Sequence, residues 1–67
     1  MKTRIIELFE KQIVGDNVEF IAECNEYDET GERVQQLSRS YFSRPSTMTD
    51  EEIINDIRTF EYSLYFA

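Results

Sequence analysis

The chain has 67 residues, with 14 Asp and Glu against 7 Lys and Arg, no His and one Cys, so its formal net charge is -7. A chain of this length buries only about 60% of the surface it exposes when unfolded, which predicts one core and a single domain, 1–67. Cys24 cannot form an internal disulfide by itself, and His, the commonest neutral metal ligand, is absent. We therefore expect no cofactor and no metal, and association with a partner as the remaining source of added stability.

The opening segment, Thr3 to Val14, is ambiguous between strand and helix. Its apolar residues fit a helical stripe, yet the short Gly15-Asp16-Asn17 connection that follows favours a β-hairpin. We therefore predict a strand. The apolar pair Ile5-Ile6 is interrupted at Glu7, too early for a signal peptide or a membrane span. A free thiol also suits a reducing compartment, so we expect a cytoplasmic protein, in the host cytoplasm if it is viral.

The next two segments read as strands joined by a turn. Between Val18 and Asn25, apolar and polar residues alternate with the period of two that is typical of a half-buried strand. Turn residues follow at Asp28-Glu29-Thr30-Gly31, and a looser alternation runs from Arg33 to Phe42. These patterns predict two further antiparallel strands.

After Pro45 the pattern changes to a helix. Thr49 and Glu52 have the spacing of a capping box, with Met48 and Ile53 placed as a hydrophobic staple. Apolar residues then recur at helical spacing as far as Leu64. The last residues also alternate with a period of two, so a short helix followed by a fourth strand is the alternative.

The predicted fold is α+β, a three-stranded antiparallel β-meander with one C-terminal helix packed on one face (βββα). Residues 1–44 would form the sheet and 45–67 mainly the helix, because the apolar sheet face and helix stripe can bury each other. Besides alternate residues of the first strand, the expected core is Val18, Phe20, Ala22, Cys24, Phe42, Ile53, Ile57, Phe60 and Leu64.

The charges are segregated along the chain. Residues 15–32 hold seven acids and no base, and residues 33–48 hold three arginines and no acid. One interpretation is an acidic surface, including Glu19, Glu23 and Glu26, that mimics nucleic acid and blocks a DNA-binding enzyme. The structural alternative is that Glu23 and Glu26 pair with Arg39 and Arg33 across a hairpin.

One helix covers only one face of a sheet, so the other face is a candidate interaction surface. An apolar strip with charged neighbours is typical of such surfaces. Ile6 or Leu8 could extend it from the first strand. Its expected members are Glu19, Ile21, Glu23, Tyr27, Leu37, Arg39 and Tyr41.

Catalysis is not expected, because no His can serve as a base and Cys24 belongs to the apolar side of its strand. We expect a small acidic protein–protein interaction module with the general character of phage or mobile-element proteins that bind and modulate a host protein. Its expected partners are itself, as a homodimer, and a larger, basic protein, without direct contact to nucleic acid or membrane. A structural subunit of a larger assembly is a further alternative.

Overall fold

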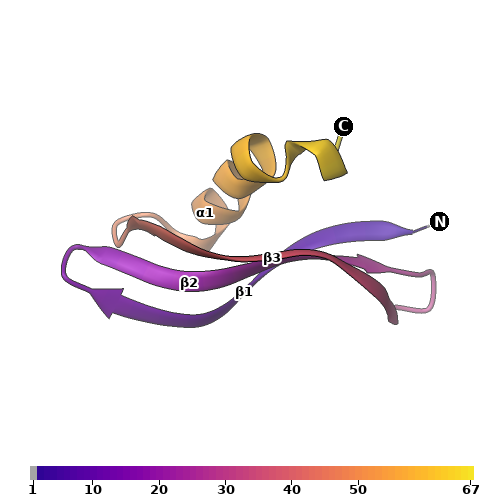
Figure 1. Ribbon diagram of the computed structural model, residues 1–67, viewed down its shortest axis with the longest axis horizontal. Helices are drawn as coiled ribbons and strands as arrows, with labels where there is room; N and C mark the ends of the chain where they lie inside the picture. The colour runs from indigo at the N-terminus through magenta and orange to yellow at the C-terminus, as the bar shows by residue number, and fades with distance from the viewer. Residues whose placement is uncertain (1) are drawn as a thin grey trace.

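A computed structural model describes residues 2–67, and Met1 lies outside the described part. Three strands, β1 (Thr3–Val14), β2 (Asn17–Tyr27) and β3 (Arg33–Pro45), form an antiparallel sheet in the order β1-β2-β3. The helix α1 (Asp50–Asp56) and the turns after it lie on one side of this sheet (Figure 1). The predicted βββα fold is confirmed, and the ambiguous first segment is a strand.

Both hairpin connections contain a glycine in the left-handed region, Gly15 at φ 62° and Gly31 at φ 89°, where a side chain would be strained. The second connection is also held by Asp28, whose Oδ1 accepts hydrogen bonds from Thr30 N (2.9 Å) and Thr30 Oγ1 (2.6 Å). The Thr30 hydroxyl is the main reason that the pKa of Asp28 lies below its usual value. The turns therefore determine which strands are neighbours.

The helix begins as its sequence predicts. Thr49 Oγ1 accepts a hydrogen bond from Glu52 N (3.2 Å), and Glu52 Oε1 accepts one from Thr49 N (2.9 Å). Met48 packs against the core from the preceding turn. This capping box satisfies two backbone amides that would otherwise lack partners at the start of the helix.

The end of the helix differs from the prediction. The α-helix stops at Asp56, a π-helical turn covers Ile57–Glu61, and a 3-10 turn follows at Ser63–Tyr65, so the alternative fourth strand is wrong. In the π turn Tyr62 N donates to Ile57 O (2.8 Å), five residues back. Tyr62 therefore takes the inward position that a regular helix would have assigned to Phe60 and Leu64.

As a result, Phe60 and Leu64 do not belong to the core. Their exposed fractions are 73% and 72%, whereas Tyr62 is 5% exposed. Tyr62 donates from its hydroxyl to Ala22 O (3.1 Å), and its ring meets the edge of Phe42, which is itself partly buried. None of the helices formed by residues 2–67 is long and apolar enough to cross a membrane.

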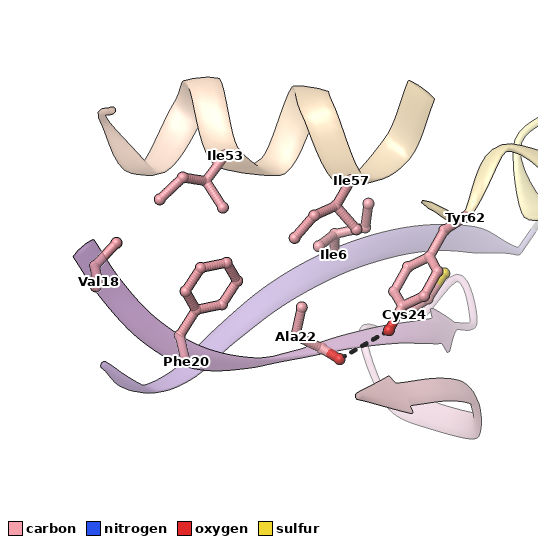
Figure 2. Packing of buried hydrophobic residues seen from close by; sticks show 8 residues of the cluster. All are labelled: Ile6, Val18, Phe20, Ala22, Cys24, Ile53, Ile57 and Tyr62. Atoms are coloured by element: carbon pink, nitrogen blue, oxygen red, sulfur yellow. Dashed lines mark hydrogen bonds between the residues drawn. The ribbon is translucent and has the colours of Figure 1, made fainter. Parts of the chain in front are cut away.

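The core lies between α1 with its following turns and the facing side of the sheet. Figure 2 shows Ile53 and Ile57 directed down onto Phe20, Ala22 and Ile6, with the Tyr62–Ala22 hydrogen bond beside them. The predicted core positions on β2 are confirmed. The buried cluster consists of Ile6, Val18, Phe20, Ala22, Cys24, Ile53, Ile57 and Tyr62.

Polar contacts attach the C-terminal segment to both edges of the sheet. On the β1 side, Lys11 Nζ lies 2.8 Å from Asp50 Oδ2, and Arg4 donates to Tyr65 O (2.8 Å). On the β3 side, Arg44 Nε lies 2.9 Å from Asp56 Oδ2. The helix is therefore held at both edges of the sheet, on one of its two faces.

We predict that the two helical positions differ sharply in their effect on stability. Ile57→Val should lower the free energy of unfolding by about 0.5–1.5 kcal/mol, because it removes a methyl group from the core. Phe60→Ala should change it by less than about 0.5 kcal/mol, because the ring is mostly in solvent. Urea denaturation followed by circular dichroism measures both values. A larger loss for Phe60→Ala than for Ile57→Val would contradict the packing described here.

Candidate functional site

The sheet face opposite α1, here called the open face, is the candidate functional site. In residues 2–67 no helix or strand packs over it (Figure 1). Strand alternation and cross-strand register assign its side chains. They are Ile5, Glu7 and Phe9 from β1, Glu19, Ile21, Glu23, Asn25 and Tyr27 from β2, and Arg33, Arg39 and Tyr41 from β3.

Leu37, which the sequence assigned to this face, lies on the helix side instead, as do Ile6 and Leu8, the two candidates for its extension onto β1. Leu37 packs against the core because the register of β3 shifts between Cys24 and Asn25, which places one extra residue there. Ile6 is 3% exposed within the core, and Leu8 packs beside it. The loose alternation of β3 did not indicate its bulge. Because Ile5 and Ile6 are both apolar, the sequence did not show which of them faces the helix.

The middle of the open face is an apolar row across all three strands. Phe9, Ile21 and Tyr41 are opposite one another in the register. Ile21 is only 2% exposed although no element covers this face, whereas Phe9 is 40% and Tyr41 80% exposed. The predicted central residue is therefore buried within the chain itself, and the two residues beside it present the apolar surface to solvent.

A polar network continues from this row along the sheet. Glu7 and Glu23 are directly opposite each other on β1 and β2, an arrangement that by itself destabilises a sheet. Asn25 Nδ2 donates to Glu7 Oε1 and to Glu23 Oε1, at 3.0 Å each, and the Tyr27 hydroxyl also donates to Glu7. These donors offset the repulsion and hold both carboxylates in place.

Arginines of β3 complete the network. Arg39 Nε lies 3.1 Å from Glu23 Oε2, which confirms one of the two cross-strand pairs expected from the sequence. The second differs: Arg33 lies 3.7 Å from Glu23, while Glu26, on the helix side, pairs with Arg4 at 3.1 Å. Alternation along β2 separates Glu23 from Glu26.

The three acids expected to imitate phosphates therefore do not form one exposed row. Glu23 is 9% exposed and engaged by arginines, Glu26 lies on the opposite face, and Glu19 alone is exposed on the open face. Most of the negative charge of β2 is thus compensated within the chain. What remains accessible on the open face is concentrated at the end near the first hairpin.

At that end β1 contains a bulge. Its pairing with β2 is irregular between Phe9 and Gln12, and Glu10 adopts φ 52°, a left-handed conformation that is uncommon for a residue other than glycine. The bulge sends Lys11 to Asp50 on the helix side, while Glu10 comes within 4.0 Å of Arg39 on the open face. The consecutive side chains of Glu10 and Lys11 thus lie on opposite faces of the sheet.

Beside the bulge the surface is hollowed. The hollow has a volume of about 140 Å³, well below the roughly 300–1,000 Å³ of typical small-molecule pockets. It is adjacent to the exposed ring of Tyr41 and matches one side chain better than a cofactor. Its lining consists of Glu10, Gln12, Glu19, Phe20 and Tyr41.

The structure thus brings together six of the seven predicted surface residues and adds others that the sequence reasoning missed. Asn25 continues the same alternating row as Ile21 and Glu23, so its position was available from the period of two. The sequence pattern did not indicate that Asn25 is almost completely buried, at 1% exposed. Its Oδ1 accepts no hydrogen bond from residues 2–67. Glu10 was hidden by the bulge, which carries no clear sequence signal.

Chemically, the open face offers hydrogen-bond donors, acceptors and an exposed aromatic ring. Cys24 is a free, buried thiol whose pKa is raised by desolvation, which opposes thiolate formation. In residues 2–67, no three Cys, Asp or Glu side chains are grouped as metal ligands.

The polar network predicts the titration of Tyr27. Its pKa lies above the usual value of about 10 mainly because its hydroxyl donates to the Glu7 carboxylate. Glu7→Gln should therefore lower the pKa of Tyr27 toward its usual value, measured from the Tyr27 ring-carbon shift by NMR. Glu10→Gln, on the same strand, is the matched control and should change it less.

The same contact has a defined effect on stability. A raised pKa in the folded state stabilises the fold below about pH 10 and loses that contribution as the pH rises through the folded value. Tyr27→Phe should therefore reduce the loss of stability in alkaline solution, measured by urea denaturation between pH 8 and 11. An unchanged alkaline profile would contradict a native contact between Tyr27 and Glu7.

No protein-family model, curated protein or solved structure matches this chain significantly. The function of the open face therefore has to be inferred from its own geometry. That geometry consists of a half-exposed apolar row, a hydrogen-bonded polar network and an acidic hollow.

Proposed function

We propose that the protein is a small protein–protein interaction module that acts in the cytoplasm and contacts its partner through the open face. The observation that carries the proposal is the position of two exposed aromatic residues, Phe9 and Tyr41, on the strands at either side of the buried Ile21. Exposed aromatic side chains on a rigid surface are typical anchors of interfaces, because they bury a large area at little cost in entropy.

The polar network supports this use of the face. Side chains held before binding lose little freedom on association, so more of the contact energy contributes to affinity. Glu7, Glu23 and Asn25 are already fixed by hydrogen bonds beside the aromatic row. The face is thus built as a preorganised surface rather than as a set of mobile side chains.

The size of the face is also sufficient. The molecule extends 40 by 22 by 17 Å, and the sheet follows its longest dimension (Figure 1). A specific interface buries about 800 Å² on each partner. One side of this molecule is therefore comparable in area with a standard interface.

Other expectations from the sequence stay predictions. The nucleic-acid mimic receives less support, because Glu23 is paired and Glu26 lies on the other face. Formation of a homodimer is opposed by electrostatic repulsion between two copies that each carry a charge of -7. Sedimentation equilibrium at micromolar concentration measures whether the dimer forms. A viral or mobile-element origin and a place in a larger assembly also stay predictions.

The proposal predicts that partner capture depends on the aromatic row. The chain, immobilised through its C-terminus, would be used to capture proteins from cell extract, with quantitative mass spectrometry as readout. Phe9→Ser with Tyr41→Ser should reduce a specifically captured protein at least about tenfold, as expected when interface anchors are truncated. The matched control is Phe60→Ser with Leu64→Ser, which removes exposed apolar surface on the other side of the molecule.

Both double variants should retain the thermal unfolding transition, so that lost capture reports binding. Capture that survives the Phe9 and Tyr41 changes, or that is lost in the control, would place the contact elsewhere. Absence of any specifically captured protein would contradict the interaction function itself.

A further inference from the structure

The open face has its own charge pattern, which indicates the chemistry of the partner. At its centre and far end, the two carboxylates of Glu7 and Glu23 are matched in number by Arg33 and Arg39, both of which are engaged with Glu23. At the hairpin end, Glu19 forms no ion pair with residues 2–67, and Glu10 has only the 4.0 Å approach of Arg39. The uncompensated charge of this face is therefore negative and lies around the hollow.

The hollow combines three features that suit a cationic side chain. The carboxylates of Glu10 and Glu19 line it, Gln12 adds an amide, and the ring of Tyr41 is 80% exposed beside them. An arginine guanidinium pairs with carboxylates through planar hydrogen bonds and also stacks on aromatic faces. Its volume of about 140 Å³ admits a side-chain end rather than a whole ligand.

Charge also decides between the classes of occupant. A second copy would bring the same acids and a further net charge of -7 to the face, and a nucleic acid would bring phosphates. A basic segment of another protein is attracted both by the whole chain and by the hollow. Phe9, next to the hollow along β1, can meet the apolar side chains of such a segment.

We propose that the open face docks a basic, amphipathic segment of a partner protein, with an arginine side chain seated between Glu10 and Glu19 against the Tyr41 ring. This inference rests on the proposed interaction function and adds the chemical class of the partner. The apolar side chains of the segment pack on Phe9, while the arginine occupies the hollow. Association is faster at low salt because the two surfaces carry opposite charge.

The test is an NMR titration of the isotope-labelled chain with a defined peptide, acetyl-Leu-Arg-Leu-Arg-Leu-Arg-amide. The matched probe replaces each arginine with citrulline, which keeps the shape and removes the charge. We expect shift changes centred on Gln12, Glu19 and Tyr41, with affinity at least about tenfold weaker for the citrulline peptide, since hydrogen bonds to charged groups are stronger than those between neutral groups.

Two variants separate the hollow from general attraction by an acidic chain. Glu10→Gln with Glu19→Gln should weaken binding of the arginine peptide at least about fivefold. Glu32→Gln with Glu51→Gln changes the net charge equally at exposed sites away from the hollow and should leave affinity within about twofold. Both variants should keep the amide spectrum of the folded chain.

The proposal would be overturned by equal binding of the citrulline peptide, by equal weakening in both double variants, or by shifts centred on the turn at 28–32. Self-association through the same residues, seen as shifts on dilution, would assign the face to a second copy. If the peptide fails while Phe9→Ser with Tyr41→Ser still abolishes protein capture, the interaction function stands and only the basic partner class is wrong.

Discussion

A single helix can cover only one face of a three-stranded sheet, so the side chains on the two faces of β2 are buried in different ways. On the helix side, Ile53, Ile57 and Tyr62 exclude water from the apolar row of β2. On the open face, burial comes from neighbouring strands. Glu23 accepts hydrogen bonds from Asn25 Nδ2 and Arg39 Nε, whereas Asn25 Oδ1 has no partner in residues 2–67. From Phe20 to Glu26 the central strand is thus buried on both sides in a chain of 67 residues.

This division explains why the molecule carries an accessible surface beside a well-packed core. Hydrophobic burial is non-directional, so the helix side tolerates irregular turns as long as an apolar side chain reaches inward. The polar network is directional, because each carboxylate needs donors in defined positions. The open face is therefore the more precisely arranged of the two, and Phe9 and Tyr41 are presented from it in a fixed register.

Irregularities in the strands and helix account for most differences from the sequence-based expectation. The bulge in β1 turns Glu10 toward the open face, the extra residue in β3 moves Leu37 to the core, and the π turn replaces Phe60 by Tyr62. Each irregularity changes which side chain faces the core or the open face. A periodic pattern cannot reveal such a change, because it assumes constant spacing.

The sequence by itself determined the βββα order, both turns, the capping box of Thr49 and the helix-side row of β2. These features depend on local chemistry: glycine in left-handed turns, a hydroxyl near free amides and an alternation of period two. Only the tertiary structure decided that Ile21 is buried, that Asn25 joins Glu7 to Glu23, and that Glu10, Glu19 and Tyr41 share a hollow. Those features depend on contacts between strands, whose geometry follows from the packing of the whole sheet.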